Sequence, residues 1–487
     1  MTDAVNERGG HRQSATNKHP PPLYRQAHVT YSQVEASGPA STAIGFPAPV
    51  VHRAEKCKVW CGNMNPASKT TQQGCGYSFE PVTVLMPVVS ATKDDTTAAP
   101  PSPYAYRLTG TQLNYSLCGE IVLADVLELC HSENQEHGNT TINEETTSSK
   151  GAVNPPLPFY RKTHTQVVIK MDRRKIIVNL HDHGPRGIPH PENPWKEISA
   201  LQLLLHGNLA EDTEQQHVLD TAPTHHHPNV IDLLTALADN ECLYEVLPYY
   251  SGGSLQDLLR RHSDGLDEDR ARRYFRQLLS AIDYLAHRGV CHRDISTSNI
   301  LLNHEQDECV LMDFGMALRV PYSFPDDHQT EDVTDVSIMM GNDDGNGGDK
   351  NMVMGTVRRR KIHSQSHCGK LRFMAPEMYQ MQDFDGLTID LWSAAAVLFW
   401  MLTGRAPYDK PDPASDAGYH DLLNDHYYWD PRGVNQVFSW GHAVSEEAVD
   451  LLKNMFRPDP KDRLTLGQVM AHPWVHGEKL PCHEKNK

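Results

Sequence analysis

The residues best placed to do chemistry are charged or amide side chains that stand beside short apolar runs. They are Lys170 at the end of VVIK, Glu197 in NPWKEISALQLL, Asp294 and Asn299 in HRDISTSN, and Asp313 in MDFG. Charged residues are mostly exposed to solvent, but the apolar neighbours of these five argue against that interpretation. An ammonium can neutralise phosphate oxygens, a carboxylate can accept a proton, and carboxylate or amide oxygens suit hard cations. The set could therefore hold a charged substrate and assist a proton transfer.

Periodic apolar positions predict the elements that must hold these side chains in place. Residues 267–289 repeat apolar residues at three- and four-residue steps, with acids at the start and a glycine at the end, which predicts an amphipathic helix. Short apolar runs at 167–169, 243–247 and 309–312 have the length and the flanking residues of strands. Helix-like and strand-like segments alternate in this way from residue 106 to residue 475.

The amino-terminal part of the chain has a different composition. Residues 1–50 are rich in Pro, Ser, Gly, His and Ala, and residues 88–104 end in TTAAPPSPY, so we expect residues 1–104 to be mostly disordered. Residues 476–487 form a tail beyond the folded part. Three polar segments, at 127–160, 206–226 and 322–366, are predicted to be loops inserted into the framework.

Bulk composition bounds the function class and the compartment. The chain has 487 residues and a net charge of −17, which argues against a nucleic-acid partner. Its longest apolar stretch, at 391–402, is too short to cross a bilayer, and the start shows no secretory signal. Ten cysteines without secretory context indicate reduced thiols. We therefore expect a cytoplasmic, or alternatively nuclear, protein without a membrane partner. The oligomeric state is left open.

Several motifs follow one another in a recognisable order. VVIK, the helical segment with Glu197, HRDISTSN and MDFG are followed by MAPE ending at Glu377, DLWS with Asp390, and DPKDRLT with Arg463. This order resembles the eukaryotic protein kinase superfamily, of the serine/threonine type, over residues 106–475. The resemblance implies an α+β, two-lobed protein kinase fold. A small antiparallel β lobe with one helix would span 106–247, and a larger, mainly α lobe would span 251–475.

The resemblance also implies a role for each residue of the set. Lys170 would hold the α- and β-phosphates of ATP and pair with Glu197, while Asn299 and Asp313 would bind Mg²⁺. Asp294 would orient the acceptor hydroxyl of a protein substrate and accept its proton. The residues implied to line the nucleotide site are Leu113, Gly119, Ile121, Val168, Leu247, Tyr249, Tyr250, Ser254 and Leu301, with Lys170 and Asp313.

The segment aligned with the nucleotide lid departs from the family pattern, L-G-x-G-x-F-G-x-V. Residues 113–124 read LNYSLCGEIVLA, so only Gly119 remains of the three glycines. Asn114 and Ser116 replace the other two, and glycines matter here because they let backbone N–H groups approach phosphate. We expect weakened rather than lost ATP binding. The alternative is that these residues form a strand hairpin and nothing more.

A second departure concerns the catalytic loop. Serine/threonine kinases place a lysine where this chain has Ser296, and a threonine where CGKLRFMAPE has Lys370. The two residues look exchanged, and a flexible lysine can reach a phosphate from a different anchor point. Our hypothesis is that Lys370 supplies the missing charge near Asp294. The alternative is that Lys370 points elsewhere and Ser296 marks weakened catalysis.

The acceptor class and the activity follow from the same loop. Thr297 and Ser298 are not arginine, the residue that tyrosine-directed kinases place nearby, so the acceptor is expected to be serine or threonine. A pseudokinase, which uses the same fold as a nucleotide-binding scaffold with weak or no catalysis, is the alternative function.

A further motif lies at residues 52–80. CKVWCGNMNPASKTTQQGCGYSF resembles a small zinc ribbon, but its first spacing is one residue too long and Gln72 stands at the third cysteine position. A structural zinc ion takes four ligands, which Cys57, Cys61, Cys75 and His52 could supply. The alternatives are a metal-free remnant or a knuckle that binds a partner.

Overall fold

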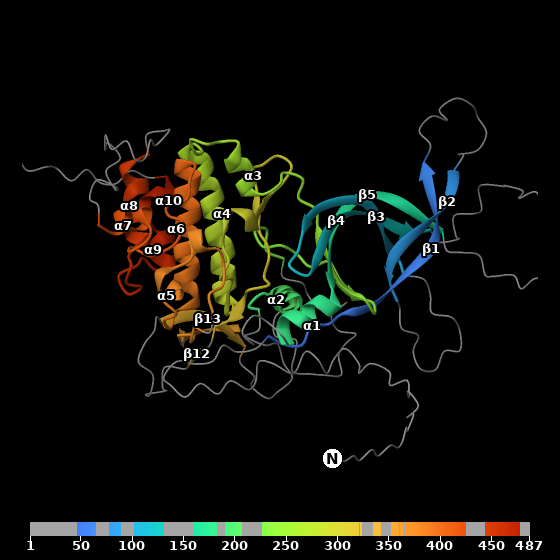
Figure 1. The fold of residues 1–487 in the computed structure, drawn as a ribbon, viewed down its shortest axis with the longest axis horizontal. Helices are drawn as coiled ribbons and strands as arrows, with labels where there is room; N and C mark the ends of the chain where they lie inside the picture. The colour runs from blue at the N-terminus through green and yellow to red at the C-terminus, as the bar shows by residue number, and fades with distance from the viewer. Residues whose placement is uncertain are drawn as a thin grey trace, which may run out of the picture.

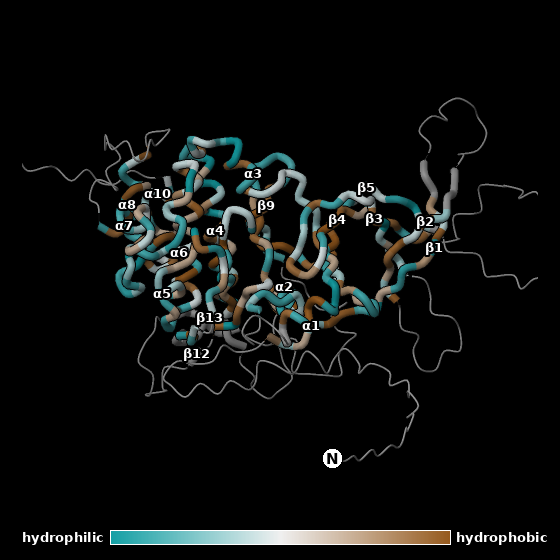
Figure 2. Tube along the Cα trace, in the orientation of Figure 1, coloured by the Kyte–Doolittle hydropathy of each residue, from teal (hydrophilic) through white to brown (hydrophobic). Residues whose placement is uncertain are grey.

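The computed structural model shows a strand-rich lobe beside a helical lobe (Figure 1). It describes residues 46–64, 77–88, 102–130, 159–182, 190–206, 226–320, 322–323, 335–341, 352–359, 361–364, 366–424 and 444–477. The predicted disorder before residue 46, most of the linker and of the inserted loops, and the tail lie outside these residues. Figure 2 shows the hydrophobic residues gathering within both lobes.

The small lobe is a closed barrel of strands with two helices inserted between two of the strands. The strands are β1 (His52–Met64), β2 (Tyr77–Pro87), β3 (Tyr104–Tyr115), β4 (Gly119–Leu129), β5 (Phe159–Arg173), β6 (Thr235–Ala238) and β7 (Cys242–Pro248). Their order around the barrel is β1-β2-β3-β4-β5-β7-β6, and a parallel pairing of β1 with β6 closes it. The helices α1 (Arg174–Asp182) and α2 (Pro194–His206) follow β5. The strands predicted at 167–169 and 243–247 are confirmed as parts of β5 and β7.

The first two strands extend the lobe beyond its predicted start at residue 106. β1 and β2 form a long antiparallel hairpin whose edges pair with β3 and β6. Ala54, Val59 and Val84 bury their side chains against the rest of the barrel. An apolar residue at every second position would be a strand signal, but the cysteines of this segment suggested a zinc ribbon instead.

The structure gives the zinc hypothesis little support among the residues it describes. Cys57 and Cys61 are strand residues, and the Cys57 thiol contacts the Met86 sulfur at 3.2 Å. Cys61 is buried in an apolar cluster with Val59. The described residues contain no group of three or more His, Cys, Asp or Glu side chains that could hold a metal ion. Cys75 lies outside them.

The large lobe is built mainly from helices. They are α3 (Leu255–Arg260), α4 (Glu268–His287), α5 (Pro376–Tyr379), α6 (Gly386–Thr403), α7 (Ala417–Asn424), α8 (Glu446–Met455), α9 (Leu466–Met470) and α10 (Pro473–His476). Short strands complete it: β8 (Val290–Cys291), β9 (Ile300–Leu302), β10 (Cys309–Leu311), β11 (Leu318–Arg319), β12 (Tyr322–Ser323), β13 (Asp335–Gly341) and β14 (Met352–Arg359). The 3₁₀ turns are η4 (Thr297–Asn299) and η5 (Leu371–Phe373). Part of the predicted loop at 322–366 is therefore an antiparallel pair of strands, β13 and β14.

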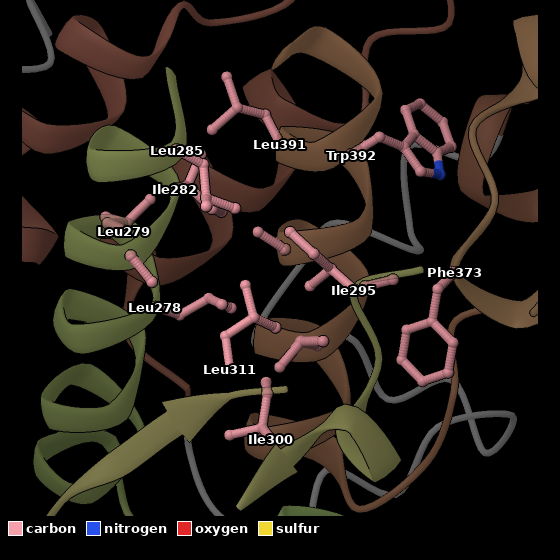
Figure 3. Packing of buried hydrophobic residues seen from close by; sticks show 14 of the residues in the cluster. Leu278, Leu279, Ile282, Leu285, Ile295, Ile300, Leu311, Phe373, Leu391 and Trp392 are labelled. Carbon is pink, nitrogen blue, oxygen red and sulfur yellow. The ribbon is translucent and has the colours of Figure 1, made fainter. Parts of the chain in front are cut away.

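Helices α4 and α6 form the core of this lobe. The predicted helix at 267–289 is confirmed: the Asp267 carboxylate caps it by accepting a hydrogen bond from the Arg270 amide. Figure 3 shows Leu278, Ile282 and Leu285 of α4 on the side of that helix that faces α6, with Leu391 of α6 nearby and Trp392 on the far side of α6. Helix α6 extends the apolar stretch at 391–402 to 18 residues, which is long and apolar enough to cross a membrane, unlike the stretch alone, but 89% of the helix is buried inside the protein. It is the central core helix of the lobe.

A buried ion pair fastens the segment before α6 to the end of the chain. The Arg463 guanidinium donates two hydrogen bonds to the Glu377 carboxylate, at 2.9 and 3.1 Å. The two side chains are 0% and 3% exposed. Arg463 also donates to the carbonyl of Thr388 at the start of α6. Because α5 carries Glu377, the pair fixes the position of the loop that includes Lys370.

Removing the cation of this pair should leave a buried carboxylate without its partner. We expect Arg463→Ala to lower the free energy of unfolding by about 3–5 kcal/mol. Arg260→Ala is the matched control, because Arg260 pairs with Asp257 at an exposed position and should matter little. Chemical denaturation of both variants measures the difference, and equal stabilities would contradict the role of the buried pair.

Candidate active site

An ion pair between the barrel and α2 forms the centre of the site. Lys170 of β5 and Glu197 of α2 meet with 2.5 Å between Nζ and Oε2, and both side chains are buried. The other Glu197 oxygen accepts a hydrogen bond from the Phe314 amide at 3.3 Å. The predicted pair thus joins β5, α2 and the MDFG segment.

More acids surround this lysine than the motifs suggested. Glu245 lies beside Lys170 on the neighbouring strand β7, and Asp172 follows two residues later on β5. Both are buried, and neither Glu245 oxygen has a hydrogen-bond partner among the described residues. The signal in the sequence was an acid inside an apolar run, CLYEVLP. None of the motifs includes this glutamate, so the motifs did not predict it at the site.

Burial and charge decide which of these groups are ionised. Burial alone would lower the pKa of Lys170, but the charges of Glu197 and of nearby aspartates outweigh it and hold that pKa well above its ordinary value. Burial raises the pKa of Glu245, and the charge of Glu197 raises it further. Burial raises the pKa of Glu197 to about 7 against the opposing charge of Lys170. The direct contact with the ammonium favours the charged form of Glu197, whereas burial and the charge of Glu197 favour the protonated form of Glu245.

The raised pKa of Glu245 predicts a pH-dependent stability. Above the ordinary carboxyl pKa of 4.5 the unfolded chain releases this proton while the folded chain keeps it, so stability falls as pH rises toward the raised folded value. Glu245→Gln removes this loss. The unfolding free energy of Glu245→Gln, relative to that of the parent, should therefore increase between pH 5.5 and pH 8 by up to about 1.4 kcal/mol per pH unit. Chemical denaturation at both pH values measures it.

The exposed Glu446→Gln is the matched control for this prediction. A gain for Glu245→Gln that is the same at both pH values would contradict the assignment of the proton to Glu245.

Helix α6 holds the backbone of the catalytic loop through hydrogen bonds. The buried Asp390 carboxylate accepts hydrogen bonds from the amides of His292 and Arg293, at 2.7 and 2.9 Å. These donors compensate an acid that would otherwise be unpaired in an apolar helix. Arg293 adopts a positive φ of 66°. The next residue, Asp294, accepts a hydrogen bond from the Asn299 side-chain amide at 2.8 Å.

The Lys370 side chain points toward Asp294. Its Nζ lies 2.6 Å from Asp294 Oδ2 and 3.3 Å from Asn299 Oδ1, and its backbone amide donates to Asp294 Oδ1 at 3.0 Å. Gly369 makes this approach possible, because its φ is 86° and an added Cβ would lie 2.5 Å from the Arg293 carbonyl oxygen. Ser296 is fully buried and its hydroxyl contacts Ser298. The Lys370 ammonium therefore lies beside Asp294, although it comes from the segment before α5 and not from the catalytic loop.

The lid between β3 and β4 is drawn onto β5. Ser116 donates a hydrogen bond to Asp172 at 2.5 Å, and Cys118 is buried near Lys170 and Asp172. Burial and the carboxylate of Asp172 raise the pKa of the Cys118 thiol to about 12. The retained glycine, Gly119, has a packing reason: an added Cβ would lie 1.8 Å from the Met171 carbonyl oxygen.

The structure sets several of the residues implied to line the nucleotide site beside one another in pairs. Strand registry sets Ile121 beside Lys170 and Val168 beside Leu247, and a bridge joins Ser254 to Leu301. The pairs come from both lobes and from the connection between them. Tyr250 packs on the main core, whereas Leu113 and Tyr249 are exposed.

Ser254 has a structural task besides. Its hydroxyl caps α3 and contacts Asp257 at 2.6 Å.

The residues near MDFG fit a magnesium ion. Asp313 offers a carboxylate and Asn299 an amide oxygen, which are hard oxygen ligands of the kind Mg²⁺ takes. Burial and the charge of Asp313 raise the pKa of Glu192, which shows that negative charge accumulates there. A divalent cation would offset this charge. The predicted metal ligands are thus chemically suited to the role.

The fold and the site together are those of a two-lobed protein kinase. Residues 200–335 and 353–475, more than half of the chain, match the protein kinase domain family, and the chain belongs to this family. The matched residues begin within α2, so Lys170 and Glu197 precede them. For these two residues the geometry supplies the argument.

Curated relatives carry the same kind of domain. CBL-interacting protein kinase 25 of Oryza sativa subsp. japonica is 30% identical over 252 residues, which cover 51% of this chain and 40% of that protein. CBL-interacting serine/threonine-protein kinase 16 of Arabidopsis thaliana is 31% identical over 256 residues, 52% of this chain and 45% of the relative. The Homo sapiens SNF-related serine/threonine-protein kinase is 27% identical over 251 residues, 52% and 26%. The similarity spans less than half the length of each relative.

Proposed function

We propose that this protein transfers the γ-phosphate of ATP to serine or threonine hydroxyls of protein substrates. The observation that carries the proposal is the contact of Lys370 with Asp294 and Asn299. This contact places a cation beside the catalytic loop. In the loop itself, Ser296 stands at the position where serine/threonine kinases have a lysine. With the Lys170–Glu197 pair formed as well, each charge that phosphoryl transfer requires has a residue to supply it.

The residues would divide the work of the reaction. Asp294, oriented by Asn299, accepts the proton of the attacking hydroxyl. Lys370 neutralises charge on the transferred phosphoryl group, and Lys170, held by Glu197, binds the phosphates nearer the adenosine. Asp313 and Asn299 would hold Mg²⁺, which when bound offsets the charge of the phosphates. Thr297 and Ser298 are not the arginine that tyrosine-directed kinases place nearby, which favours a serine or threonine acceptor.

Removing either member of the Lys370–Asp294 contact should abolish most activity. With Mg-ATP and a mixed serine/threonine peptide library, we expect Asp294→Asn and Lys370→Met each to lower kcat by about 10²–10³-fold. Lys453→Met, an exposed lysine on α8, is the control. The exchange variant Ser296→Lys/Lys370→Thr should keep more activity than Lys370→Met, because it restores a lysine from the other loop.

Two results would oppose this proposal. Activity that is equal in the parent and in Asp294→Asn would indicate a contaminating kinase. Full activity of Lys370→Met would remove the proposed role of that lysine.

A nucleotide-binding scaffold with little catalysis is the second candidate, and the lid favours it. The hydrogen bond from Ser116 to Asp172 and the burial of Cys118 bring the lid close to Lys170. Phosphates reaching Lys170 would have to displace this contact. A hydrogen bond to a charged group contributes more than a neutral one, so its loss would weaken nucleotide binding.

A glycine at position 116 tests this contribution. Ser116→Gly removes the hydroxyl and should tighten Mg-ATP binding by about tenfold, the effect of one charge-assisted hydrogen bond. The measurement is the concentration of Mg-ATP that gives half of the thermal stabilisation. Ser251→Gly, an exposed serine outside the lid, is the control. Unchanged binding in Ser116→Gly would mean that the lid contact does not oppose the nucleotide.

A further inference from the structure

The segment just before β1 is hydrogen-bonded to α2, the helix that carries Glu197. The Val50 amide donates to Gln202 Oε1 at 2.8 Å, and Gln202 Nε2 donates back to the Val50 carbonyl oxygen at 2.7 Å. These two hydrogen bonds join residues that are 152 positions apart in the chain. A side-chain amide is suited to this because it donates and accepts at once.

The residues on either side of Val50 fix this segment to the rest of the protein. Phe46 and Val51 pack against the main hydrophobic core. His52 and Arg53 then pair in parallel with β6, and the Arg53 carbonyl oxygen accepts a hydrogen bond from the Val88 amide at 2.8 Å. Figure 1 shows the blue segment leading into β1 along α1 and α2. The contacts on both sides of Val50 therefore hold this residue in place against the barrel.

The position of α2 decides whether the central ion pair can form. Lys170 belongs to the barrel and Glu197 to α2, so their 2.5 Å contact depends on how the helix sits against the strands. Gln202 lies five residues beyond Glu197, which is about 7.5 Å along a helix axis. From the large lobe, Tyr284 donates a hydrogen bond to the Leu204 carbonyl oxygen. The Val50 contact is the corresponding restraint from the barrel side.

We propose that residues 46–53 are a built-in activating segment, and that Gln202 is the positioning residue through which they hold Glu197 against Lys170. This rests on the proposed phosphotransferase activity. Gln202 touches neither nucleotide nor substrate and acts only through the place of α2. A chain that loses this contact keeps its catalytic residues but forms the Lys170–Glu197 pair less often.

The test measures phosphoryl transfer in full-length variants. Gln202→Leu removes both hydrogen bonds, and it should lower kcat/KM for Mg-ATP by about tenfold, the size expected of one or two neutral hydrogen bonds. Gln202→Glu keeps only an acceptor and should fall between Gln202→Leu and the parent. Gln382→Leu, at an exposed position of the large lobe, is the matched control.

A double-mutant cycle separates positioning from general stability. In a Glu197→Gln background the ion pair is already lost, so Gln202→Leu should there change the residual activity by less than about twofold. A Gln202→Leu enzyme as active as the parent, or one whose tenfold loss persists beside Glu197→Gln, would overturn the inference. Should Gln202→Leu not fold, Val50→Pro removes the donating amide and leaves the hydrogen bond from Gln202 to the Val50 carbonyl oxygen, so its activity should fall between those expected for Gln202→Leu and the parent.

Failure of the proposed function would be visible separately. A parent protein without Mg-ATP-dependent activity refutes phosphoryl transfer. An active parent with unaffected Gln202 variants refutes only the activating segment.

Discussion

A lysine buried among acids is the constraint around which the site is organised. An ammonium away from water needs a close carboxylate, and Lys170 has one in Glu197. That partner stands on α2, so the requirement draws a helix against the barrel. The same carboxylate accepts the Phe314 amide, which brings the MDFG segment of the large lobe to the same point. One ion pair therefore relates three parts of the molecule that are distant in sequence.

Glu245 shows what this concentration of charge costs. It adds a second carboxyl group beside a single ammonium, and burial raises the pKa of that carboxyl, which favours its protonated form. A protonated acid can stay near Lys170 without competing for the charge that Glu197 supplies. Whether the Lys170–Glu197 pair forms then depends on the position of α2. The segment around Val50 lies outside the site and restrains that position.

The catalytic loop solves a related problem by different means. Its backbone is fixed by Asp390, and its aspartate meets an ammonium that comes from the segment before α5. The Glu377–Arg463 pair anchors that segment at its far end. In this arrangement the cation near Asp294 is present only when the segment lies in its folded place. Completion of the site therefore depends on the position of this segment.

The sequence by itself determined the order of the motifs, the helix at 267–289, the strands at 167–169 and 243–247, and the residues that would bind phosphate and metal. These follow from local patterns, because apolar period and loop chemistry are written within a few neighbouring residues. It also raised the exchange of Ser296 and Lys370, but not the direction of the lysine. Only the tertiary structure decided the direction of the Lys370 side chain and the closure of the barrel by β1 and β2. It also decided the burial that raises the pKa of Glu245 and the hydrogen bonds between Val50 and Gln202. Each depends on a partner far along the chain, and neither spacing nor composition specifies which distant groups will share a buried space.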